Sequence, residues 1–185
     1  RVTALALLGL EAQKVTVTMT VGSTIIYGPV VRGMSGRITT TWSQYFFGHF
    51  DYIPSLLLQD LPPVNGAVIT ILIENISGQN LACSEVVVGN KIFLGHAQYN
   101  AESDSLNFSK IERNDFGESL LLARRTVPKV NVDLMSDKAL VPQIRKTRID
   151  LNAVPALWSA MDDQYDDPFF EAVFIYGIYK QFTIN

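Results

Sequence analysis

Charged side chains are scarce in this chain. Of its 185 residues, 18% are Asp, Glu, Lys or Arg, and the 15 basic and 18 acidic residues leave a net charge of −3. Proteins that bind the phosphate backbone of a nucleic acid carry clusters of basic side chains. The basic residues here stand in small groups along a mildly acidic chain. The sequence therefore predicts no nucleic-acid partner.

Cysteine is almost absent. Cys83 is the single cysteine of the chain, which excludes an internal disulfide. It lies in an apolar stretch, and no second cysteine or histidine stands at the spacing of a zinc site. We expect Cys83 to be a buried small hydrophobic residue.

Long hydrophobic runs are also missing. Wholly apolar stretches such as Ala4–Leu8 are far shorter than the roughly 18 residues that indicate a membrane-spanning helix. The sequence predicts no membrane span. Phosphate-binding loops of the GxxxxGK[ST] or GxGxxG type do not occur either, and we expect no cofactor.

Catalytic motifs are lacking as well. His49 and His96 are the only histidines available as a general base, and neither stands in a recognised catalytic motif. The aromatic neighbours of His49 favour a packing role. Asp162, Asp163, Asp166 and Asp167 form an acidic cluster that can hold a hard cation or act as the paired carboxylates of a hydrolase. Because its spacing does not fit a calcium loop and nothing supplies a cleft, we expect a solvated loop and no enzyme.

Hydrophobic residues, in contrast, make up 48% of the chain. Low charge together with high hydrophobicity suits a subunit whose surface is partly covered by neighbours. A monomeric β domain with a large core is the alternative.

Short apolar segments separated by turn signals predict a mainly β fold. Val15–Thr20 alternates apolar and hydroxyl residues with the period of a strand. Further strands are expected at residues 25–27, 38–42, 56–58, 67–73 and 81–88. Residues 67–73 have the composition of a strand that is covered on both faces or lies in the middle of a sandwich. This spacing of strands is typical of a β-sandwich.

The second half of the chain is predicted to contain a helix as well as strands. The sequence predicts a hairpin over residues 108–125 with its turn at Asn114–Gly117, and a strand over residues 127–135. The one predicted helix spans Leu140–Leu151, with Pro142 in its first turn. Residues 169–184 are aromatic and β-branched and should form one long strand or two joined at Gly177.

These patterns divide the chain into two predicted domains. Residues 1–97 are expected to form a jelly-roll-like β-sandwich, whose first strand or strands precede Arg1. Residues 98–185 are expected to form a smaller β-rich domain that contains one α-helix.

Aromatic side chains gather between Trp42 and Tyr52. Trp42, Tyr45, Phe47 and Tyr52 are the candidate contact residues of the chain. Aromatic faces on the loops of a β-sandwich can pack on the apolar faces of sugar rings. The alternative is a core or subunit contact, in which aromatics contribute much of the buried area, and the number of aromatics favours this alternative.

Several motifs taken together resemble a group of tailed-bacteriophage and prophage virion proteins. In the first half they are Val2–Ala12, Val15–Thr20, Trp42–Phe47, Asp60–Pro63 and Ala82–Asn90. In the second half they are Phe108–Gly117, Arg124–Arg125, Pro155–Trp158 and Ile175–Ile184. The resemblance covers nearly the whole chain.

The resemblance implies a structural component of a phage tail, at the distal end or the fibre-attachment region. It also implies a galactose-binding-like jelly roll in the first half, since Val86–Gly89 is similar to a late strand of that fold. The expected partners are other copies of the chain and neighbouring tail proteins, within the tail of the virion. A carbohydrate-binding module that contacts a glycan on the host surface is the alternative function.

Overall fold

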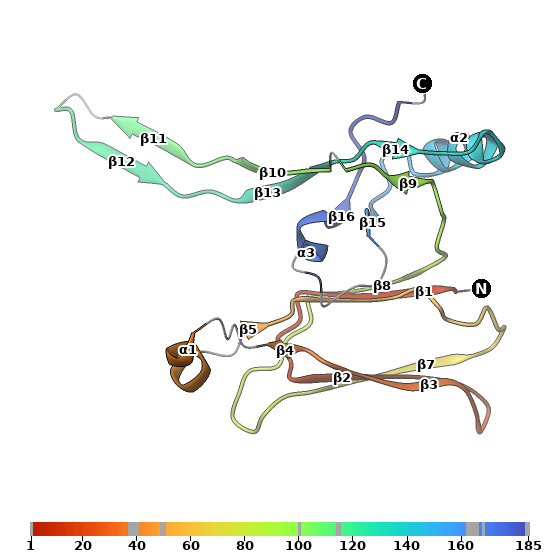
Figure 1. Ribbon diagram of the computed structural model, residues 1–185. Coiled ribbons are helices and arrows are strands. Elements are labelled where there is room, and N and C mark those ends of the chain that lie inside the picture. The colour runs from red at the N-terminus through yellow and green to blue at the C-terminus, as the bar shows by residue number, and fades with distance from the viewer. Residues whose placement is uncertain are drawn as a thin grey trace. The chain divides into compact units, whose positions relative to one another are not determined.

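The computed structural model describes residues 2–36, 41–48, 51–99, 101–113, 116–161, 167 and 169–183. The fold is mainly β, with 46% strand and 14% helix arranged as several small antiparallel sheets, which confirms the predicted class (Figure 1). The chain divides into two compact units, residues 1–92 and residues 93–185. We describe each unit by itself.

Unit 1 contains two three-stranded antiparallel sheets. The first has the order β6-β1-β8, formed by β6 (Ser55–Leu58), β1 (Ala4–Leu8) and β8 (Glu85–Gly89). The second has the order β3-β2-β7, formed by β3 (Thr24–Gly33), β2 (Lys14–Val21) and β7 (Val68–Glu74). The chain passes repeatedly from one sheet to the other, so that both contribute to one core.

This core follows from the alternation seen in the sequence. Val15, Val17 and Met19 of β2 are buried, whereas the threonines between them are only half-buried. The buried side of β2 packs in one cluster with Leu5 and Leu7 of β1. The predicted strand over residues 15–20 is therefore confirmed, and its period of two separates the core face from the outer face.

The strand β7 differs from expectation. Its β-branched composition predicted a strand covered on both faces or lying in the middle of a sandwich, but β7 lies at the edge of its sheet and none of its side chains is fully buried. Val68 and Leu72 are exposed. The amino-acid composition indicates how well the residues suit a pleated strand, but it does not determine whether one face or both faces of that strand are covered.

The connection from β3 to β6 contains a helix that the sequence did not predict. It runs through β4 (Ser35–Gly36), α1 (Trp42–Phe47) and β5 (Asp51–Tyr52), and β4 pairs with β5. The strand predicted over residues 38–42 lies largely outside the described residues, and Trp42 begins α1 instead.

Unit 2 contains a long hairpin. Its base is formed by β10 (Glu102–Asn107) and β13 (Thr126–Asn131), and its outer part by β11 (Lys110–Arg113) and β12 (Ser119–Leu122). The predicted hairpin over residues 108–125 is confirmed in β11 and β12. The strand predicted over residues 127–135 is interrupted, because β14 (Leu134–Met135) pairs separately with β9 (His96–Ala97).

The remainder of unit 2 holds its helices. The helix α2 (Val141–Asp150) follows a 3₁₀ turn, η1 (Lys138–Leu140), and confirms the predicted helix. The strand β15 (Ala156–Ser159) pairs with β16 (Phe174–Gly177), and a short helix, α3 (Phe170–Val173), precedes β16. The prediction of strand over residues 169–184 is thus wrong for α3 and for residues 178–183, and unit 2 has more than one helix.

Candidate contact surfaces

The helix α1 is stabilised by its own ends. The Thr41 backbone N–H donates to Gln44 Oε1 (3.1 Å), and the Gln44 N–H donates to Thr41 Oγ1 (3.3 Å), which together form a capping box. At the other end, the Gly48 N–H donates to the Gln44 carbonyl (2.9 Å). A helix of six residues is short for independent stability, so these caps hold the turn that presents its side chains.

Four aromatic side chains of α1 form one cluster. Trp42 and Phe46 stack, with ring centroids 6.2 Å apart and planes 18° apart. Tyr45 contacts the Phe46 ring edge-on at 5.1 Å, and Phe47 lies beside Phe46 at 6.4 Å. None of the helix residues is buried, and Trp42 and Phe47 are 80% and 83% exposed. We call Trp42, Tyr45, Phe46 and Phe47 the aromatic cluster.

The structure brings together three of the four predicted contact residues. Trp42, Tyr45 and Phe47 lie on α1, whereas Tyr52 is half-buried in β5 and its hydroxyl is hydrogen-bonded to the Asn75 side chain at 3.3 Å. Tyr52 is thus held within unit 1 and does not join the cluster. Phe46, which was not among the predicted contact residues, sits at its centre because helical spacing places it one turn from Trp42.

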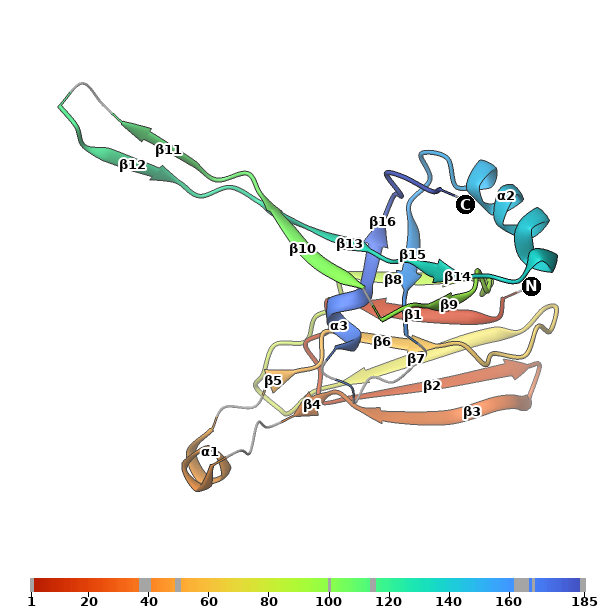
Figure 2. The ribbon, with the colours of Figure 1, turned by 45° about the horizontal axis from the view of Figure 1, so that its top comes forward.

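The arm is a second surface rich in exposed apolar side chains. We use this name for the hairpin over residues 102–131, whose outer part, β11 and β12, extends away from the helices of unit 2 (Figure 2). Every described residue of β10 and β11 is exposed. Ile111, Leu120 and Leu121 are 64%, 60% and 73% exposed. In the sequence, the three consecutive leucines at residues 120–122 indicate this surface. Because successive strand residues point to opposite sides, three leucines in a row place apolar side chains on both sides of the strand.

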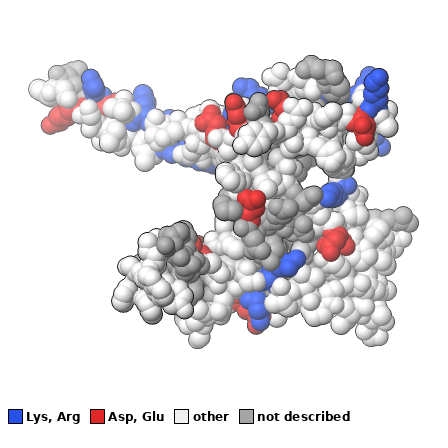
Figure 3. Space-filling view, viewed as in Figure 1, with Lys and Arg blue, Asp and Glu red and all other residues white. Residues whose placement is uncertain are grey.

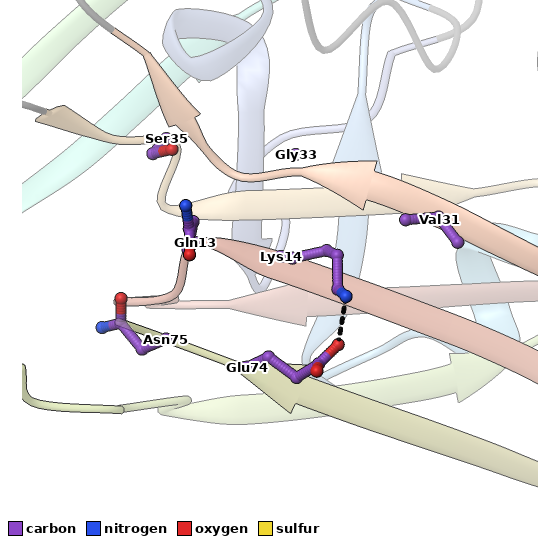
Figure 4. Close-up of a pocket in the computed structure, with 7 residues that line it drawn as sticks. All are labelled: Gln13, Lys14, Val31, Gly33, Ser35, Glu74 and Asn75. Atoms are coloured by element: carbon purple, nitrogen blue, oxygen red, sulfur yellow. Dashed lines mark ion pairs between the residues drawn. The ribbon is translucent and has the colours of Figure 1, made fainter. Parts of the chain in front are cut away.

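An open hollow on unit 1 offers little for catalysis (Figure 4). It is lined by Gln13, Lys14, Val31, Gly33, Ser35, Glu74 and Asn75. Lys14 and Glu74 face each other across the β2–β7 ladder and form an ion pair at 2.7 Å. Both side chains are 44% exposed, and an exposed pair of this kind contributes about 0–1 kcal/mol. Its geometry is that of an ordinary surface pair.

Of the other positions considered in the sequence, the structure describes Cys83, His96 and Asp167. Cys83 is half-buried, with Sγ 3.6 Å from the Glu85 carbonyl, and so is more exposed than expected. His96 is exposed, and its ring contacts Phe93 at 5.1 Å. His49, Asp162, Asp163 and Asp166 lie outside the described residues. The Asp167 carboxylate accepts a hydrogen bond from the Phe169 N–H (2.8 Å).

Neither a metal centre nor a spanning helix is present in the described part of the chain. No group of three or more His, Cys, Asp or Glu side chains comes together there with the geometry to hold a metal ion. Of the helices in the same residues, none combines the length and hydropathy needed to cross a membrane.

No family model, curated protein or solved structure matches this chain.

Proposed function

We propose that this chain is a structural subunit of a bacteriophage tail, in the distal or fibre-attachment region, that assembles through apolar and aromatic contacts. The observation that carries the proposal is the aromatic cluster, because α1 buries none of its own residues and displays four aromatic rings. Its partners are other copies of the chain and neighbouring tail proteins, and its location is the tail of the virion.

The size of the aromatic cluster suits a protein contact. An aromatic side chain can bury about 150–250 Å². Four of them therefore supply several hundred Å² of mainly apolar surface, a large share of the roughly 800 Å² that each partner contributes to a standard interface. Contiguous apolar patches of this kind on a protein surface mark interaction sites.

Unit 1 also has an unusually uncharged sequence. Five Lys or Arg and five Asp or Glu residues lie in residues 1–92, and the other 23 charged residues of the chain belong to unit 2. Figure 3 accordingly shows few charged side chains over the part of unit 1 formed by β2, β3 and β7. A surface with few charges is inexpensive to desolvate, which favours burial between subunits.

For unit 1 we propose a reduced jelly roll of the galactose-binding-like kind. Two three-stranded antiparallel sheets share one core, and the chain alternates between them. The apolar-Gly pattern at residues 86–89, which the sequence resemblance associates with a late strand of that fold, lies in β8, the last strand of unit 1.

Sedimentation velocity of the purified chain over a wide concentration range tests the proposal. We expect the weight-average sedimentation coefficient to rise with concentration as copies associate. Electron microscopy of phage particles labelled with an antibody against the chain should place the label on the tail. A compact monomer at every concentration, without affinity for tail proteins, would overturn the proposal.

Glycan binding is a second candidate, favoured by the exposure of Trp42. Phe46 stacks on one side of the indole, and the side chain is nevertheless 80% exposed. An exposed aromatic ring can pack on the apolar face of a sugar. An adsorption module of this kind is compatible with a structural subunit.

A further inference from the structure

We propose that the arm of one copy packs, through its uncharged side, on the outer face of the β3-β2-β7 sheet of a second copy. The inference rests on the proposed function, since it names a second contact, in addition to the aromatic cluster, through which copies of an assembling subunit meet.

The arm lacks an internal core. It consists of two paired strands throughout, and a two-stranded hairpin is marginally stable at best in water. Ile111 pairs with Leu121 on one side of β11 and β12, while Leu120 lies on the other side, opposite Glu112. All three apolar side chains are exposed. Cover from another surface on the first of these sides would bury Ile111 and Leu121 and stabilise the hairpin.

The two sides of the arm differ in charge. On one side of the base the paired residues are uncharged, with Ser103 opposite Val130, Ser105 opposite Pro128 and Asn107 opposite Thr126. In the outer part Ile111 lies opposite Leu121, and the even spacing of Asn107 and Ile111 on the strand without the extra residue assigns this pair to the same side. On the other side are the charged residues Glu102, Asp104, Lys110, Glu112 and Lys129. Arg113, next to the tip, is the exception on the first side. We call the first side the uncharged side of the arm.

The outer face of the β3-β2-β7 sheet has the same chemistry. Three rows cross the sheet, formed by Val31, Thr16 and Leu72, by Thr18 and Thr70, and by Ile25, Thr20 and Val68. The aliphatic members of these rows are exposed, and the threonines of β2 are half-buried. The face ends at the Lys14–Glu74 ion pair, in which the two charges neutralise each other.

Charge and strand geometry together favour this match. Burial of an unpaired charge against an uncharged sheet is costly, so only the uncharged side of the arm can pack there. Two faces of hydroxyl and aliphatic residues can stack as sheets do, at a separation of about 10 Å.

The contact joins copies head to tail. Each copy carries one arm and one β3-β2-β7 face, and these two surfaces differ. A contact between unlike surfaces generates a ring when the rotation closes and a filament when it does not. The outer face of the sheet is thus the receiving surface for an arm, and the arm is the inserting element.

Site-specific photo-cross-linking tests the contact. In a Cys83→Ala background, Ile111→Cys is labelled with a benzophenone maleimide, which reacts with whatever C–H bonds lie near it. The labelled chain is mixed with an equal amount of ¹⁵N-labelled chain, so that mass spectrometry separates cross-links between copies from those within one copy. Leu120→Cys, on the other side of the same hairpin and similarly exposed, is the control.

We expect cross-links between copies from position 111 to peptides of β2, β3 or β7, and few from position 120. Leu72→Asp in the receiving copy should reduce these cross-links about tenfold or more, because a carboxylate would be buried against the arm. Thr70→Asp, at another exposed position of the same face, should have the same effect.

Cross-links within one copy, cross-links to another surface, or equal yields from positions 111 and 120 would overturn the inference. Sedimentation of the same samples separates the two proposals. Multimers that cross-link elsewhere overturn the arm contact alone, whereas monomers at every concentration overturn the assembly function as well.

Discussion

Trp42 and Phe46 stack one helical turn apart on α1, with ring centroids 6.2 Å apart, although neither ring is buried. Pairs of aromatic residues that contact each other and remain exposed have the character of binding hot spots. Their contribution to folding is small, because little of their surface leaves the water when the chain folds.

We expect Trp42→Ala and Phe46→Ala each to weaken self-association while leaving the fold intact. A hot-spot residue contributes about 2 kcal/mol or more, so the dissociation constant should rise roughly 30-fold. The free energy of unfolding should change by about 0.5 kcal/mol or less. Sedimentation velocity and urea denaturation measure the two quantities. Tyr99→Ala, at a fully exposed aromatic of unit 2, should leave association unchanged, and an equal effect there would contradict the prediction.

The same rings separate assembly from glycan recognition. If the aromatic cluster binds a glycan, an array should show binding that is lost in both Trp42→Ala and Tyr45→Ala. If it serves assembly alone, the array should show no binding, or binding that neither substitution changes. We expect the second result, because the four exposed rings of the aromatic cluster are more than one sugar site uses.

Leu7→Ala should strongly destabilise unit 1. Leu7 is fully buried in the core shared by the two sheets, and truncation of a core leucine leaves a cavity that costs about 2–5 kcal/mol. Leu120→Ala removes the same atoms from an exposed position of the arm and should cost about 0.5 kcal/mol or less in the isolated chain. Urea denaturation at low protein concentration measures both. Equal losses would show that Leu7 is not a core residue.

Gly9→Ala should destabilise unit 1 more than Gly22→Ala. Both glycines have positive φ, +61° at Gly9 and +58° at Gly22, which costs an L-residue about 1–2 kcal/mol. A Cβ at Gly9 would also collide with the Ser84 side chain, whereas a Cβ at Gly22 meets nothing within 4 Å. The difference between the two unfolding free energies isolates the collision. The double variant Gly9→Ala with Ser84→Gly should recover part of it, and no recovery would assign the loss to another cause.

Tyr179→Phe should loosen the C-terminal segment of unit 2. The half-buried Tyr179 hydroxyl donates to the Arg148 carbonyl of α2 (2.6 Å), and Arg148 in turn donates to the Phe182 carbonyl (3.3 Å). Loss of one such hydrogen bond costs about 0.5–1.5 kcal/mol. Hydrogen exchange should therefore accelerate at residues 178–183 and at the end of α2. Tyr99→Phe, at a fully exposed position, should change neither region.

Periodicity predicted the parts of the fold that local chemistry determines. Val15–Thr20 alternates because one side of β2 faces the core, and α2 has a proline in its first turn, the helical position that tolerates one. The strand prediction for residues 169–184 is partly wrong because aromatic and β-branched residues favour strands only in a context that provides pairing. The chain instead turns through α3 before it pairs β16 with β15.

The contact surfaces were only partly accessible to sequence reasoning. The sequence shows that aromatic residues are abundant near Trp42. It does not show that a short helix groups Phe46 with Trp42 and leaves Tyr52 out, because this helix depends on the capping box between Thr41 and Gln44. The outer face of the β3-β2-β7 sheet was not predicted, because it is assembled from strands distant in sequence whose register sets which side chains become neighbours.

The ladder of the arm changes register between its base and its outer part. Asn107 faces Thr126 and Lys110 faces Leu122, so two residues on one strand lie opposite three on the other. Arg124 and Arg125 occupy the longer side of this bulge, and both are exposed. Accessible backbone that follows an arginine is a substrate for trypsin. The rate of trypsin cleavage at residues 124–125 thus measures assembly of the unmodified chain. Cleavage would be fast in free subunits and slow once the arm is covered.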